Sequence, residues 1–204
     1  MGLKSGLPAG ATPLDPDAVA GLIPNHITTQ EQLNEWEYAN VARGEEWAFG
    51  AIRRDMFTIE FLQQLHRKMF GDTWNWAGVF RTREVQPVGS APENIRPDLS
   101  VLLGNTNVQI RHRSWNPEEI AARFHHRLVQ IHPFPNGNGR FARTMTDLLL
   151  HRSGHARFSW GEGLDRTGDA RERYIAALRA ADGRDFGPLL ALLSPAASTN
   201  PPRR

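Results

Sequence analysis

One twelve-residue stretch, His132–Arg143, has the sequence HPFPNGNGRFAR and combines residue types that can bind and react with a phosphate. Its prolines and glycines predict a tight turn that ends one helix and begins another. The first turn of the second helix would present unpaired backbone N–H groups, with the positive end of the helix dipole behind them. Because Gly137 and Gly139 have no side chains, an anion can approach these donors closely. The turn therefore predicts an anion site suited to phosphate.

Three side chains around this turn extend the prediction from binding to chemistry. Arg140 and Arg143 are three residues apart, so they share one helix face and can clamp a polyphosphate with two guanidinium groups. His132 lies on the other side of the turn, and its residue type is the one nearby that suits general-base chemistry near neutral pH. The set predicts base-assisted attack on a bound nucleotide phosphate. A P-loop is excluded, because no Gly-Lys-Ser/Thr follows the turn.

The elements that must position these residues are mostly helices. Thr29 and Gln32 have the spacing of a capping box, and Asn116 followed by Pro117 is a strong helix start. Pro133 ends the helix that carries His132. Between the helices, residues 79–88 contain short extended pieces closed by Gly and Pro, which predict a small β-hairpin or ordered loop. The fold class is all-α, a helical bundle with a small β-hairpin flap. The predicted helices start near Thr29 and cover about 58–70, 99–110, 117–132, 140–153, 169–181 and 186–193.

Composition excludes several classes of protein. The chain has 204 residues, 40% of them hydrophobic, and no cysteine, so disulfide scaffolds, thiol nucleophiles, zinc fingers and iron–sulfur clusters are excluded. No apolar run approaches the ~20 residues of a membrane span, and the first residues do not have the pattern of a signal peptide. We therefore expect a soluble, cytoplasmic protein with no membrane partner. Its 24 Lys+Arg against 22 Asp+Glu give a net charge of only +2, which argues against a nucleic-acid partner.

The twelve-residue motif resembles the signature of the Fic family, whose wider group is called Fido: His-x-Phe-x-Asp/Glu-Gly-Asn-Gly-Arg-x-x-Arg. Residues 76–81, WAGVFR, resemble the segment that leads into the flap of that family, and residues 173–193 resemble its closing helices. Residues 13–40 resemble the N-terminal segment of a bacterial branch called mobile mystery protein B, where PNGNGR also occurs. The resemblance covers about residues 11–196. It divides the chain into a flexible N-terminal arm (1–25), an N-terminal helical segment (26–57), a Fido (Fic-type) domain (58–196) and a flexible tail (197–204).

The resemblance implies a nucleotidyltransferase that moves AMP from ATP to a Ser, Thr or Tyr hydroxyl of a target protein, which makes the chain a protein adenylyltransferase (AMPylase). His132 would deprotonate the hydroxyl, and Phe134 would be buried and anchor the loop. The target backbone would lie as an added strand along the flap. The residues implied for nucleotide binding are Gly137, Asn138, Gly139, Arg140, Arg143 and Tyr174, the last of which could equally be a core residue. Those implied for docking the target are Arg81, Thr82, Arg83, Glu84 and Val85.

Two departures from the family pattern concern metal binding and regulation. Asn136 stands where the family has Asp or Glu to hold Mg²⁺, and an amide oxygen is a weaker, neutral ligand. We expect Mg²⁺ with ATP, but held weakly. No Ser/Thr-x-x-x-Glu-Gly/Asn inhibitory motif is found, and Glu35 and Glu37 are the candidate substitutes, with a solvated helix face as the alternative. A histidine metal site is disfavoured, because His125 and His132 would be ~10 Å apart along one helix.

Other functions stay open beside the transferase. The chain could be a catalytically weak nucleotide-binding or interaction module, toxin-like on mobile DNA and silenced by a small partner protein. It could also be a Fic relative that transfers another phosphate-containing group, or a nucleic-acid binder that uses its arginines.

Overall fold

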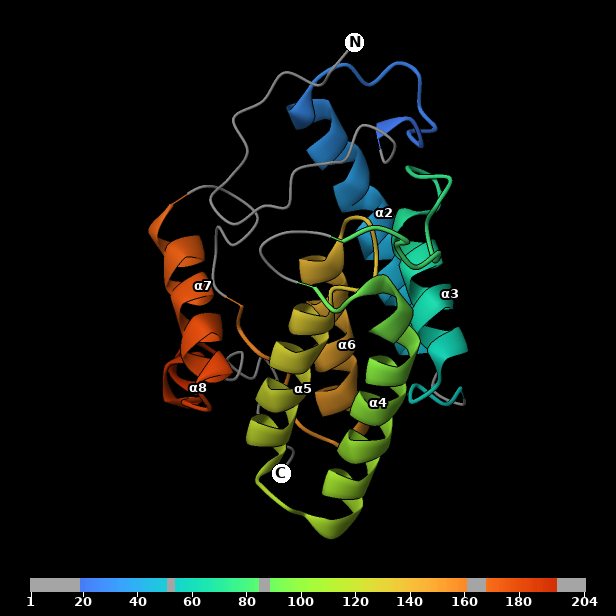
Figure 1. Ribbon diagram of the computed structural model, residues 1–204. Coiled ribbons are helices and arrows are strands. Elements are labelled where there is room, and N and C mark those ends of the chain that lie inside the picture. Colours follow the sequence, from blue (N-terminus) through green and yellow to red (C-terminus); the bar gives the residue numbers. More distant parts are fainter. Residues whose placement is uncertain (1–18, 51–53, 85–88, 161–167, 194–204) are drawn as a thin grey trace, which may run out of the picture.

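The computed structural model describes residues 19–50, 54–84, 89–160 and 168–193 (Figure 1). The predicted all-α class is confirmed. The elements are α2 (Gln30–Gly50), α3 (Ile59–Phe70), the short 3₁₀ helix η1 (Pro92–Asn94), α4 (Ile95–His112), α5 (Pro117–Ile131), α6 (Asn138–Arg152), α7 (Asp169–Asp182) and α8 (Gly187–Leu192).

Helices α5 and α6 form the centre of the bundle, and the loop between them carries the motif (Figure 1). Helices α4 and α8 pack on α5, while α2 and α3 pack on each other and on α6. One hydrophobic core joins these helices, and its largest fully buried side chains include Trp74, Phe124, Phe134 and Phe141. The two ends of the motif loop are therefore fixed by helices that are packed on several sides.

Local sequence signals account for the observed helix ends. The Gln32 side chain accepts a hydrogen bond from the Thr29 N–H (3.2 Å), and the Gln32 N–H donates to the Thr29 hydroxyl (3.3 Å), which is the predicted capping box. Thr58 caps α3, and Asn116 caps α5 by accepting from the Glu119 N–H. Such caps satisfy N–H groups that a helix leaves without partners, and they explain why the predicted and observed starts agree.

The predicted β-hairpin flap is not formed by the residues that the structure describes. Residues 79–84 and 89–91 contain no strand, and residues 85–88 lie outside the described part. The reason is that the backbone N–H groups at Arg81 and Ser90, one on each arm, donate to the end of α5 and to the motif loop instead of pairing across the arms. The Arg81 N–H donates to the Pro133 carbonyl (3.0 Å), and the Ser90 N–H donates to the Ile131 carbonyl (3.1 Å). The described residues 79–84 and 89–91 form a loop attached to the motif, in agreement with the alternative to a hairpin.

Residues 19–25 belong to the segment predicted as a flexible arm, yet they bond to the loop after α3. The Ile23 N–H donates to the Thr73 carbonyl and the Asn75 N–H to the Gly21 carbonyl, both at 2.9 Å, beside an isolated bridge between Leu22 and Trp74. Residues 1–18 of that arm, the flap residue Val85 and the tail 197–204 lie outside the described residues. Among the described helices, none is long and apolar enough to cross a membrane.

Candidate functional site

The motif loop is shaped by two residues in the left-handed conformation. His132 ends α5 with φ 53° and ψ 61°, and Gly137 precedes α6 with φ 77°. A Cβ atom on Gly137 would lie 2.5 Å from Cζ of Phe70, so both the backbone angle and the lack of space require glycine. The first N–H groups of α6 follow directly, at the positive end of its dipole, as the predicted anion site requires.

Asn138 and Phe134 hold the loop together from inside. The Asn138 side chain accepts from the Phe134 N–H (2.9 Å) and donates to the Phe134 carbonyl (2.7 Å), and it is only 3% exposed. Phe134 is fully buried and packs against Phe80 and Phe141. These side-chain contacts of Asn138 hold the loop geometry, and its binding to the nucleotide stays a prediction.

His132 is in the protonation state that a general base needs. Its Nδ1 lies 3.3 Å from the Val129 carbonyl, which can only accept, so Nδ1 carries the proton and Nε2 is the basic nitrogen. Burial lowers the pKa of His132 to about 4, an effect that the bond to Val129 opposes and the charge of Arg81 reinforces. The ring is therefore neutral at physiological pH and able to accept a proton.

Arg81, predicted to dock a target protein, is only 5% exposed, and its side chain contacts the motif loop. Its Nε donates to the His132 carbonyl (2.7 Å), and its other nitrogens donate to the carbonyls of Ile131, Arg83 and Ser90. Arg81 therefore fixes the backbone at His132, a role that the sequence did not predict. Thr82, Arg83 and Glu84 are exposed and remain predicted docking residues.

The two arginines of the motif have different surroundings. The Arg140 guanidinium forms an ion pair with Glu37 of α2 (2.6 Å), whose side chain is 3% exposed and also accepts from Trp74 Nε1 (2.7 Å). Arg143 extends over the helix start, because a Cβ on Gly139 would lie 3.9 Å from its Nη1. Of the two candidate regulatory glutamates, Glu37 thus contacts the motif, through its first arginine. Glu35 is exposed on the same helix.

Asn136 was expected to be a weak metal ligand. Its Oδ1 accepts a hydrogen bond from the N–H of Gly137 (2.6 Å), so the one amide oxygen it offers already has a partner. Within the described residues, no group of three His, Asp or Glu side chains could hold a metal ion. Mg²⁺ prefers carboxylates together with substrate phosphates, and this donor set does not fit it. We therefore derive no catalytic step that passes through a metal.

Tyr174 lies at the edge of the core. Its hydroxyl is 2.6 Å from Nε2 of His125, while Nδ1 of His125 is 3.2 Å from the Thr146 hydroxyl. Because the Thr146 hydroxyl donates to the Ala142 carbonyl, it accepts from His125 Nδ1, and Tyr174 donates to Nε2. This arrangement matches the core alternative for Tyr174. Stacking on a nucleobase stays a prediction.

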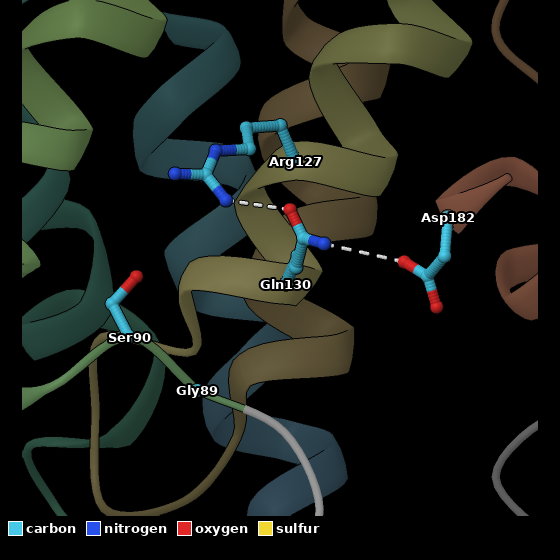
Figure 2. A pocket seen from close by; sticks show the side chains of 5 residues that line it. All are labelled: Gly89, Ser90, Arg127, Gln130 and Asp182. Carbon is cyan, nitrogen blue, oxygen red and sulfur yellow. Dashed lines mark hydrogen bonds between the residues drawn. The ribbon is translucent and has the colours of Figure 1, made fainter. Parts of the chain in front are cut away.

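A cavity of about 330 Å³ lies beside Gly89 and Ser90, where the chain continues from the predicted flap towards α4 (Figure 2). In it, Arg127 donates to Gln130 (2.5 Å) and Gln130 donates to Asp182 (3.3 Å), so a polar chain connects α5 to the end of α7. Since no predicted nucleotide-binding residue lines it, we do not assign it to the nucleotide. Its lining residues are Gly89, Ser90, Arg127, Gln130 and Asp182.

These features define a helical bundle in which the loop before α6 carries a neutral histidine, and comparisons with known proteins show what the chain is similar to. Residues 56–150 match the sequence model of the Fic/DOC family. It is 32% identical over 107 residues to the protein adenylyltransferase Fic of Aedes aegypti, which covers 50% of this chain and 21% of that protein. It is 31% identical over 138 residues to the protein adenylyltransferase fic-1 of Caenorhabditis briggsae. That match covers 65% of this chain and 26% of that protein. The chain thus spans about a quarter or less of these curated relatives.

Solved structures agree with the fold. The N-terminal Fic domain of a Bartonella quintana cell filamentation protein, solved with bound ADP, has a TM-score of 0.66 and 20% identity, and the alignment covers 85% of this chain and 90% of that one. The structure of residues 134–508 of Fic-1 from C. elegans has a TM-score of 0.62 and 25% identity. The alignment covers 85% of this chain and 51% of that one.

Proposed function

We propose that this chain is a protein adenylyltransferase that moves AMP from ATP to a hydroxyl of a target protein. The observation that carries the proposal is the arrangement on one loop of a neutral histidine and a glycine-capped helix start, with Arg143 over that start. The names of the relatives above and the ADP bound to the Bartonella domain support the same activity and substrate.

The chemistry follows from the roles that these groups can take. Nε2 of His132 accepts the proton of the attacking hydroxyl, and the hydroxyl oxygen forms a bond to the α-phosphorus of ATP. The bond between that phosphorus and the bridging oxygen breaks, and pyrophosphate leaves with the electron pair. The N–H groups at the start of α6 and the guanidinium of Arg143 would stabilise the negative charge on the phosphates. The proton then leaves His132 for solvent.

Labelling with ATP that carries the label on its α-phosphate tests the proposal. The chain is incubated in a lysate with this nucleotide, and in parallel with ATP labelled on the γ-phosphate. Transfer of AMP predicts that adding the chain increases label on protein from the first nucleotide alone, measured against lysate without the chain. An increase of label from the γ-labelled nucleotide that depends on the added chain would indicate transfer of another phosphate-containing group. Nucleotide binding with no label on protein would favour the weak binding module, and the transferase would then be wrong.

The finer features of the function are part of the same proposal. The target would contact the exposed residues Thr82 to Glu84 and the adjoining cavity, which begins at Gly89. A small regulatory partner and a toxin-like role on mobile DNA are supported only by the resemblance of residues 13–40 to mobile mystery protein B, and a cytoplasmic location only by the sequence patterns described above. A gene for a small protein beside this one would favour that branch.

Replacing Asn136 by aspartate is expected to change the affinity for ATP in opposite directions without and with Mg²⁺. The N136D variant keeps an oxygen that can accept from the Gly137 N–H, so charge is the main change. Without Mg²⁺ the added negative charge should repel ATP, and with Mg²⁺ the carboxylate should recruit the ion and tighten binding. We expect Kd to change by about tenfold in each direction, or ~1.4 kcal/mol. Binding titrations with and without Mg²⁺ measure it. Equal binding in both conditions would mean that residue 136 does not face the metal.

A further inference from the structure

His66 is a fully buried histidine beneath the motif loop, and nothing in the sequence analysis assigned it a role. It lies on α3, among the apolar residues by which that helix packs into the core. Its ring stacks on Phe134, with centroids 3.7 Å apart and planes 21° apart, and it also contacts Phe70. A polar ring in such surroundings is costly unless both of its nitrogens have hydrogen-bond partners.

Both ring nitrogens do have partners, and the partners determine the tautomer. The N–H of Gly78 donates to Nδ1 (3.0 Å), so Nδ1 carries no proton. The carbonyl of Asn136 lies 3.1 Å from Nε2 and can only accept, so Nε2 carries the proton and donates it. One ring therefore connects the segment that leads into the flap with the loop that carries the motif. Burial lowers the pKa of His66 to about 3, so the ring stays neutral and keeps this pattern near physiological pH.

The contact with Asn136 has a direct consequence for the proposed phosphate site. The carbonyl of Asn136 and the N–H of Gly137 belong to the same peptide unit, which is planar and trans. In such a unit the two groups point in opposite directions. Holding the carbonyl inward against His66 therefore directs the Gly137 N–H away from the core. That N–H belongs to the residue directly before α6, and in the structure Oδ1 of Asn136 accepts from it (2.6 Å).

We propose that His66 is a positioning residue that orients the Asn136–Gly137 peptide, and with it the backbone N–H group that precedes α6 at the proposed anion site. This inference rests on the proposed function for its effect on catalysis, but the orientation of the peptide does not. Arg81 acts on the other end of the loop, where it holds the carbonyl of His132 (2.7 Å). The two buried side chains thus fix the backbone at both ends of the loop: Arg81 at the proposed base, and His66 at the N–H group that would face the phosphate.

Two variants separate positioning from a general structural role. In H66N, the side-chain oxygen can take the place of Nδ1 and accept from Gly78, but nothing reaches Asn136. In H66Q, the side-chain amide can take the place of Nε2 and donate to Asn136, but nothing accepts from Gly78. Each variant loses the ring and one buried hydrogen bond, so similar melting temperatures are expected. A misplaced peptide should lower kcat by about 10- to 100-fold in H66N and by about threefold or less in H66Q.

A second measurement does not depend on transferase activity. The Gly137 N–H donates to Oδ1 of Asn136 (2.6 Å), and a misplaced peptide should weaken this bond, so the Gly137 amide should exchange with solvent faster in H66N than in H66Q. The Gly78 amide donates to the His66 ring and should show the opposite order. If the parent chain transfers no label, the proposed function fails and these exchange rates still test the positioning of the peptide. Equal kcat and equal exchange in the two variants, or the reverse order, would overturn the inference. Should a variant not fold, ring ¹⁵N shifts of the parent decide, because a proton on Nδ1 of His66 would contradict the contact.

Discussion

Replacing His132 by alanine is expected to lower the rate of AMP transfer by about 10²- to 10⁴-fold, the usual cost of removing a general base. ATP binding should stay near the parental value, because in the proposed reaction the ring acts on the proton of the hydroxyl and not on the phosphates. The measurement is initial-rate transfer of α-labelled AMP, with nucleotide titrations alongside. H132N is the matched control, since asparagine tolerates the left-handed conformation at φ 53° but offers no basic nitrogen. Parental rates in either variant would overturn the assignment of the base.

The pH dependence of the parent enzyme gives an independent check on the same residue. The pKa of His132 is lowered to about 4, so the basic form predominates above that pH and disappears as the pH falls through it. Anionic phosphates beside the ring would raise the pKa again in the complex with ATP. The acid limb of the rate should therefore lie between about pH 4 and the usual histidine value near 6.5. The transfer rate at each pH must be divided by the folded fraction at that pH, so that acid unfolding is not mistaken for protonation of His132.

The parts of the fold predicted from the sequence are those that depend on local interactions. The N-terminal ends of α2, α3 and α5 are determined by side chains that bond to backbone groups three residues away. A short window of sequence therefore contains the whole interaction, and these helix starts could be predicted. The turn in the motif loop could be predicted for a similar reason. Its prolines and glycines restrict the backbone directly, and the left-handed Gly137 lies within the predicted turn.

Interactions between distant residues were harder to predict. Arg140 and Glu37 are 103 residues apart, so no short window of sequence contains both partners, and only the resemblance to a family with an inhibitory glutamate makes Glu37 a candidate. Arg81 was placed on a hairpin because extended residues and turn residues alternate there, while its bonds lead to the backbone of the motif loop. His66 could have been found from one signal, a polar residue at a buried position of an amphipathic helix, since such a residue requires partners.

Replacing Arg140 by alanine is expected to affect stability as well as binding, because the structure pairs this arginine with a buried carboxylate. Removing one partner of a buried ion pair typically costs about 3–5 kcal/mol, since the other charge is left without compensation. R140A should therefore unfold at a lower urea concentration than the parent. Loss of a charge-assisted hydrogen bond to phosphate would in addition weaken ATP binding by roughly 1.5–3 kcal/mol. Urea titration and nucleotide titration measure the two effects separately.

The variants E37Q and E37Q/R140A separate the two roles of Arg140. Glutamine keeps an oxygen that can accept from Trp74 Nε1 but removes the charge that Arg140 neutralises. The double variant should therefore recover most of the stability that R140A loses, while ATP binding stays weak. E37Q alone releases the guanidinium from its partner, so ATP should bind more tightly than in the parent and transfer should rise, as expected of a glutamate that competes with phosphate for this arginine. If E37Q binds ATP more weakly than the parent, Glu37 orients Arg140 for the phosphates and does not compete with them.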